Sequence, residues 1–115
     1  MKIVKKAIRI KELKEMAQEG FGNLVKAVVD IKKGIMVVGG EFHADEEVLL
    51  IEQEKSRRED TWGINFRLEE TGEEFIEFDS MINIKPAFGN RSRGVDNPEI
   101  REKIKEIASE LIDKS

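Results

Sequence analysis

Apolar residues alternate with other residues in the first third of the chain, and this alternation predicts a hairpin. Every second residue from Val25 to Ile31 is apolar, and a period of two that is rich in valine is typical of a β-strand. A short turn at 32–34 ends in glycine and precedes a second apolar run at 35–38, which is the pattern of a hairpin with a bulged turn. Residues 24–31 also fit the helical period, so a helix there is the alternative.

Four more segments have strand patterns. A short strand is expected within residues 2–8, and the apolar run 48–51 predicts another. The segment 62–68 alternates in polarity, whereas 75–84 is a long extended stretch with a bend expected near Ser80. The strands therefore follow one another along most of the chain.

Helical spacing occurs near both ends of the chain. Apolar residues recur at helical intervals over about 10–19, and Gly20 supplies an end for that helix. The second helix has clearer boundaries, because Asn97 is a good N-cap and Pro98 suits the first helical position. An apolar stripe continues from there to Leu111.

These elements predict one α+β domain over residues 1–115. The expected architecture is an antiparallel meander sheet packed on one face by an N-terminal and a C-terminal helix. The chain contains no internal repeat, low-complexity stretch or linker. The other face of the sheet is where a site or a partner surface is expected.

Composition narrows the functional classes. Cysteine is absent, which excludes disulfides, cysteine-bound zinc, iron–sulfur clusters and a cysteine nucleophile. The net charge of −4 disfavours a nucleic-acid partner, because such proteins usually carry a basic surplus. Charged residues make up 38% of the chain, and an excess of Glu and Lys indicates a thermophilic source.

The longest wholly apolar run, 35–38, is too short to cross a membrane. The N-terminal segment also lacks the apolar stretch of a signal peptide. We therefore expect a cytoplasmic protein without a membrane partner.

A first candidate site lies in the acidic segment 39–47. If this segment is extended, Glu41, His43 and Asp45 point to one face. Such a group could bind a divalent cation, or His43 could act as a catalytic base oriented by Asp45. His43 is the only histidine, which excludes a multi-histidine zinc site within one chain. The alternative is a solvated acidic run in which Asp45 caps a turn.

A second candidate is the carboxylate pair Glu77 and Asp79, which share one side of an extended segment. Two such carboxylates can hold a metal ion or divide the roles of acid and base. Neutralisation by lysines of a neighbouring strand is the alternative.

A third candidate is the loop 88–95, in which Asn90, Arg91 and Arg93 lie between two glycines and precede a helix. Guanidinium groups and loop amides beside a helix N-terminus suit a phosphate or a carboxylate. Pairing of the arginines with the protein's own acids is the alternative.

Trp62, the only tryptophan, could line a pocket together with Asn65 and Asn83. A lone tryptophan on a strand is more often part of the core.

Four runs of the sequence are distinctive: GGEFHADEE (39–47), WGIN (62–65), EFDSMINIKP (77–86) and GNRSRGV (89–95). Together they resemble a family of small uncharacterised prokaryotic proteins, from about residue 24 to the last helix. The resemblance implies no activity, so the function has to be argued from the residues.

The leading functional hypothesis is a binding module. In this hypothesis Arg91 and Arg93 hold an anionic small molecule or an acidic peptide. The residues expected on the opposite side of the pocket are Glu41, His43 and Asp45.

Two alternatives belong to other classes. The first is a metal-assisted phosphoester hydrolase, with a divalent cation held by Glu41, Asp45 and Asp79 and a proton moved by His43. The second is a structural or interaction protein, such as a homodimer formed through an exposed edge or face of the sheet.

Overall fold

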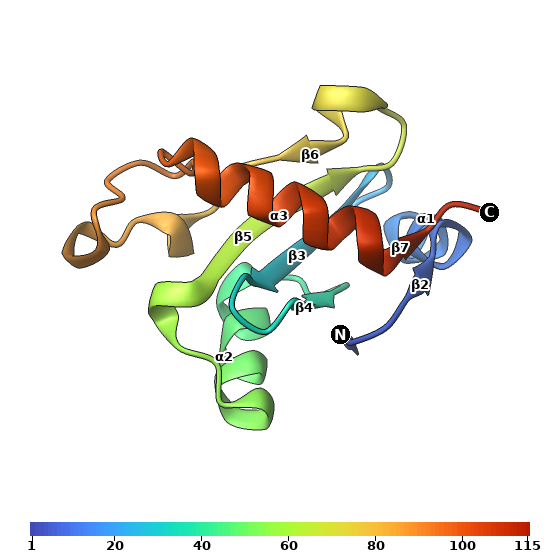
Figure 1. Ribbon diagram of the computed structural model, residues 1–115. Helices are drawn as coiled ribbons and strands as arrows, with labels where there is room; N and C mark the ends of the chain where they lie inside the picture. Colours follow the sequence, from blue (N-terminus) through green and yellow to red (C-terminus); the bar gives the residue numbers. More distant parts are fainter.

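A five-stranded antiparallel sheet forms the centre of the computed structural model, which describes residues 1–115 (Figure 1). Its strands are β1 (Lys2–Val4), β3 (Leu24–Asp30), β4 (Ile35–Val38), β5 (Thr61–Arg67) and β6 (Ile76–Glu77). They lie side by side in the order β1-β4-β3-β5-β6. A separate parallel pair joins β2 (Ile8–Arg9) to β7 (Ile112–Asp113).

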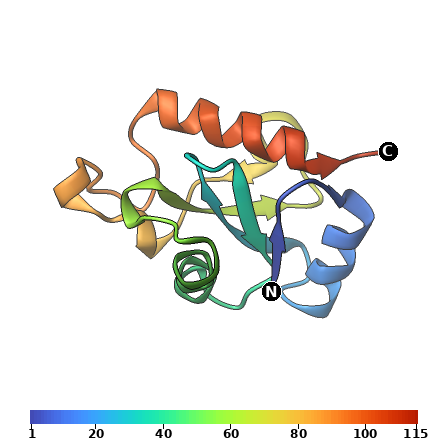
Figure 2. The same cartoon turned by 60° about the horizontal axis from the view of Figure 1, so that its bottom comes forward.

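Helices cover both faces of this sheet. The α-helices are α1 (Ile10–Glu19), α2 (His43–Glu54) and α3 (Pro98–Leu111). Four short 3-10 turns are η1 (Arg58–Asp60), η2 (Gly72–Glu74), η3 (Met81–Asn83) and η4 (Pro86–Phe88). Figure 2 shows α3 above the sheet and α2 below it, with α1 at one end.

The alternation along β3 determines what each face contains. Val25, Ala27 and Val29 belong to the main core, which also contains buried residues of α1 and α3. Val28 belongs to the opposite face, where a smaller cluster packs against α2. Its buried members are Val28, Ile35, Val37, Leu50 and Ile82.

Much of the predicted secondary structure is confirmed. The helix over 10–19, the strands of the 24–38 hairpin and the strand over the 62–68 segment are present as α1, β3, β4 and β5. Asn97 caps α3 as expected, because its side-chain oxygen accepts a hydrogen bond from the Glu99 amide at 2.8 Å. The α+β class and the terminal helices are also confirmed.

The prediction for residues 39–51 was wrong. Helix α2 begins at His43 and continues to Glu54, so 39–47 is not an extended segment and 48–51 is not a strand. The helix has a weak start signal, because Phe42 at the N-cap has no side chain that accepts a hydrogen bond. Asp45 and Glu46 in its first turn favour a helix through the helix dipole.

Helix α2 also changes the connection between the strands. It leads from β4 to β5, which lie on opposite edges of β3. The consecutive pairs β3–β4 and β5–β6 are adjacent as in a meander, whereas β4 and β5 are separated. The sheet is consequently covered by a helix on the face that we expected to be open.

Two further strand predictions were too long. The 2–8 segment forms two short strands instead of one, and only Ile76–Glu77 of the 75–84 stretch is a strand. Beyond β6 the chain leaves the ladder. There the side chain of Asn83 makes the hydrogen bonds to β5 that the backbone of a neighbouring strand would make. The Asn83 amide group accepts a hydrogen bond from the Gly63 amide at 2.8 Å and donates one to the Gly63 carbonyl at 2.9 Å.

Candidate functional site

A cleft of about 460 Å³ opens on the α2 face of the sheet. The N-terminus of α2, the first half of β3, the middle of β5 and the segment from β6 to η3 form its walls, with Arg93 added from the following loop. Small-molecule sites in proteins have volumes of about 300–1,000 Å³. The cleft therefore has the size of a site for a small organic molecule.

Strand pairing places three polar residues in one row across the cleft. Lys26 of β3 lies opposite Asn65 of β5, and Asn65 lies opposite Glu77 of β6. Because these residues are direct partners across the ladder, their side chains share the α2 face. The row joins a lysine, a carboxamide and a carboxylate within the width of three strands.

The floor of the cleft depends on a glycine. A Cβ atom at Gly63 would lie 2.5 Å from the Cβ of Ser80 and 3.2 Å from the Cγ of His43. Both side chains therefore pack directly over the backbone of β5. Only glycine allows them to approach so closely, because any larger residue would displace Ser80.

His43 is a largely buried side chain in the wall of the cleft. It is 8% exposed, and its Nε2 lies 2.8 Å from the carbonyl oxygen of Ile64, to which it donates a hydrogen bond. Burial lowers the pKa of His43 below its usual 6.5, and the nearby charge of Lys26 lowers it further. The hydrogen bond to Ile64 and the contact with Asn65 partly offset this decrease.

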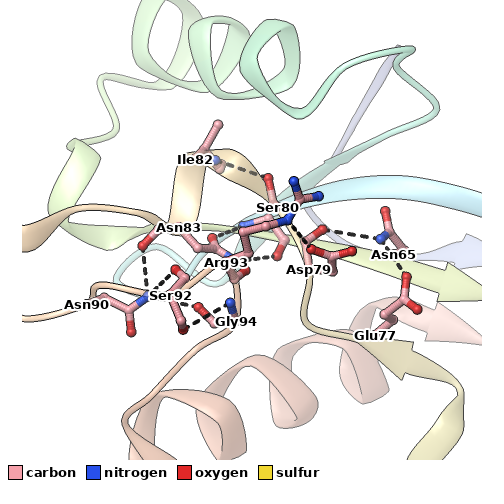
Figure 3. Close-up of polar contacts among 11 residues, drawn as sticks. Asn65, Glu77, Asp79, Ser80, Ile82, Asn83, Asn90, Ser92, Arg93 and Gly94 are labelled. Atoms are coloured by element: carbon pink, nitrogen blue, oxygen red, sulfur yellow. Dashed lines mark hydrogen bonds and ion pairs between the residues drawn. The ribbon is translucent and has the colours of Figure 1, made fainter.

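Asn65 has one group engaged and one group free (Figure 3). Its Nδ2 donates hydrogen bonds to Oε1 of Glu77 at 2.9 Å and to the carbonyl oxygen of Asp79 at 3.3 Å. Its Oδ1 is buried and has no hydrogen-bond partner. Hydrogen bonding to the side chain of Asn65 raises the pKa of the His43 imidazole, so His43 is the group of the chain placed to donate to this oxygen when its ring is protonated.

The charges of the cleft leave one cation without a partner. Arg93 pairs with Asp79 at 2.6 Å, and Glu77 pairs with Arg67 at 3.2 Å. Lys26 forms no ion pair. Its ammonium group instead lies 5.1 Å from the centre of the Phe21 ring and 5.8 Å from that of Phe42.

The start of α2 adds to this positive potential. The helix N-terminus carries a partial positive charge and unbonded backbone amides. Phe42 at the N-cap provides no side-chain acceptor for them, and both His43 and Ala44 line the cleft. An anion in the cleft could thus interact with Lys26 and with the first turn of α2 together.

Two adjacent glutamates of α2 have different environments. Glu46 is fully buried, its Oε2 accepts a hydrogen bond from the Gly40 amide at 3.1 Å, and its Oε1 has no partner. Burial raises its pKa from 4.5 to about 9. Glu47 instead accepts a hydrogen bond from the Thr61 hydroxyl at 2.6 Å and pairs with Arg58 at 3.5 Å.

The structure brings together some of the residues singled out in the sequence. His43, Asp79 and Arg93 line the cleft, as do Asn65 and Glu77. These residues lie up to 50 positions apart in the chain. The sequence analysis had placed them in four separate candidate groups.

Other expected site residues lie elsewhere. Glu41 lines a neighbouring cleft of about 210 Å³, which also contains Lys26. Asp45 is exposed on α2. Arg91 is exposed in its loop, where its backbone amide donates to Asp96 at 3.4 Å.

Trp62 and Asn90 do not line the cleft. Trp62 is 2% exposed in the main core, with the Lys85 ammonium 4.2 Å from its ring centre. Asn90 is 3% exposed and organises the loop around it. Its Nδ2 donates to three backbone carbonyls and its Oδ1 accepts from the Asp96 amide.

The carboxylates proposed as metal ligands do not gather. The chain has no group of three or more His, Asp or Glu side chains arranged to hold a metal ion. Glu41, Asp45 and Asp79 are accordingly not a common ligand set.

The sequence analysis missed Lys26, Ser80, Phe21 and Phe42 as cleft residues. Lys26 carried a usable signal, because it is a single charge between Val25 and Ala27 in a strand that is otherwise buried on both faces. Nothing in the sequence pointed to the other three.

The fold and the cleft define an α+β protein with a mixed-charge pocket at a helix N-terminus. The chain belongs to the family described as Protein of unknown function (DUF5674), whose model matches residues 2–111. No curated protein matches the chain, and no solved structure matches it either. None of its helices has the length and apolar character needed to cross a membrane.

Proposed function

We propose that this protein is a binding module that holds a small anionic molecule in the cleft at the N-terminus of α2. The observation that supports this function most directly is the unpaired Lys26 beside the uncapped first turn of α2. Both attract an anion, because Lys26 has no ion-pair partner and no side chain caps the first amides of α2.

The charge balance of the cleft supports an anion over a cation. Asp79 is neutralised by Arg93, and Glu77 by Arg67. The remaining charge is that of Lys26. A bound anion would compensate it in a partly enclosed site, where charge pairs are screened less than on an open surface.

A metal-assisted phosphoester hydrolase gains no comparable support. Asp79 and His43 share the cleft, but Glu41 and Asp45 do not join them to form a group of ligands. We therefore propose binding without a metal ion as the function of this site.

The test is a titration of the purified protein with inorganic phosphate, small organic phosphates and small carboxylates, followed through the imidazole signals of His43. These signals need no assignment, because the chain has one histidine. Binding should be lost in Lys26→Met and retained in Lys33→Met, which removes an exposed lysine from the β3–β4 turn. Binding that survives Lys26→Met unchanged, or no binding by any of these anions at millimolar concentration, would contradict the proposal.

A further inference from the structure

Three apolar side chains stand exposed around the mouth of the polar cleft. Phe21, Phe42 and Met81 are 50%, 60% and 63% exposed, and all three line the cleft. They come from three different segments, namely the turn before β3, the N-cap of α2 and the start of η3. The fold thus gathers an apolar rim above a polar floor.

The two aromatic rings of this rim flank the unpaired cation. The Lys26 ammonium lies within 5.8 Å of both ring centres. A group bound to that ammonium is therefore next to both rings. Phe21 and Phe42 pack on no other aromatic ring and are half or more exposed, so much of each ring is accessible to a ligand.

We infer that the ligand is an organic anion that carries a planar ring, such as an aryl phosphate, an aryl carboxylate or a nucleotide. This inference rests on the proposed function and adds the class of ligand to it. The anionic group binds at Lys26 and the first turn of α2. The ring lies against Phe21, Phe42 and Met81, because aromatic and thioether groups both make favourable contacts with a ring.

The volume of the cleft supports an organic body on the anion. A water molecule occupies about 30 Å³ in the liquid, whereas the cleft offers about 460 Å³. A bare inorganic anion would leave most of this space, and the whole apolar rim, in contact with water. A ring fills the space and removes apolar surface from water at the same time.

The polar row on the floor of the cleft also supports a site. Lys26, Asn65 and Glu77 are direct partners across three strands, and all three line the cleft. The uncapped helix start and this polar row therefore lie in the same cleft as the rim.

The experiment compares ligands that share an anionic group and differ in the ring. Isothermal titration calorimetry would measure dissociation constants for phenyl phosphate, glycerol phosphate and inorganic phosphate. A second arm compares benzoate with acetate, and adenosine monophosphate with ribose phosphate. The ring-bearing member of each pair should bind at least about tenfold more tightly, as expected from the free energy of stacking on an aromatic side chain.

The matched variants are Phe21→Ala/Phe42→Ala and the control Phe88→Ala. Phe88 is 53% exposed and does not line the cleft. The preference for the ring should fall to less than about threefold in the double variant and stay unchanged in the control. Melting temperatures would verify that all variants fold, since the three rings lie at the surface.

The outcomes separate the two proposals. Equal binding of ring-bearing and ring-free anions, abolished by Lys26→Met, would overturn the inference and leave the proposed function standing. A ring preference that persists in the double variant would also overturn the inference. No binding of any member would contradict both.

Discussion

The side chain of Asn83 pairs with the backbone of Gly63 as a strand would, with hydrogen bonds of 2.8 and 2.9 Å to both its amide and its carbonyl. The same carboxamide donates to the Arg93 carbonyl at 2.9 Å. One fully buried residue therefore closes the edge of β5 and fixes the loop that carries Arg93.

Asn83→Ala should consequently destabilise the fold by about 3 kcal/mol, because it leaves the amide and the carbonyl of Gly63 without partners in a buried position. Equilibrium unfolding in urea would measure the loss. Asn23→Ala is the control, since Asn23 is exposed and its side chain makes no hydrogen bond, and we expect a change below about 0.5 kcal/mol. An Asn83→Ala protein as stable as this control would show that the edge is held by other groups.

Arg91 and Arg93 provide a matched pair for ligand binding. Arg93 lines the cleft, whereas Arg91 does not. Arg93→Gln should weaken the binding of a phosphate by about tenfold, because it leaves the Asp79 carboxylate unpaired and adds a negative charge to the cleft. Arg91→Gln should leave the affinity within about twofold. The comparison is made by calorimetry at low ionic strength, and equal losses in both variants would contradict the placement of the anion in this cleft.

His43 should titrate below pH 6.5 in the free protein, because its burial lowers its pKa. At pH values between the native pKa of His43 and its unfolded pKa of 6.5, the native state therefore binds fewer protons than the unfolded state. The contribution of His43 to stability is therefore complete above pH 6.5 and falls as the pH decreases through the native pKa. A bound anion should raise this pKa.

Proton NMR of the single imidazole measures both effects directly. His43→Gln should lack the signal and the pH dependence that accompanies it. A pKa at or above 6.5 in the free protein would show that the ring is more solvated than the structure indicates.

Substitution of the neighbouring residues Glu46 and Glu47 of α2 should change the free energy of unfolding in opposite directions. Since burial raises the pKa of Glu46 from 4.5 to about 9, the native state binds the extra proton and stability decreases as the pH rises between these values. Glu46→Gln removes this dependence and should stabilise the protein by about 2 kcal/mol at pH 7.

Glu47→Gln should instead destabilise the protein by about 1 kcal/mol, because it removes the charge that pairs with Arg58 and receives the Thr61 hydroxyl. Urea unfolding at pH 5, 7 and 9 would test both variants. A loss of stability in Glu46→Gln that is the same at all three pH values would contradict a protonated Glu46.

Local signals in the sequence were sufficient for some elements. The Asn97-Pro98 start defined α3, and the period of two defined β3 and β5, because these patterns act over a few residues. Helix α2 was missed because the apolar run 48–51 fits either type of element. Its start at Phe42 also lacks a capping residue.

The site was only partly predictable for a different reason. His43, Asp79 and Arg93 were recognised as chemically unusual, but their proximity depends on the crossover of α2 and on the departure of the chain from the ladder after β6. Both are tertiary effects. Lys26 was overlooked because a lysine on a strand normally faces water, whereas here a helix covers that face.

The central place of β3 also bears on how the chain reaches its native structure. One edge of β3 pairs with β4 across a turn of four residues, Ile31 to Gly34. The other edge pairs with β5, which follows in the chain only after the whole of α2. Contacts between distant segments carry the larger entropy of loop closure and limit the rate of folding. We expect the β3–β4 hairpin to form first and the cleft to be assembled last, when β5 docks.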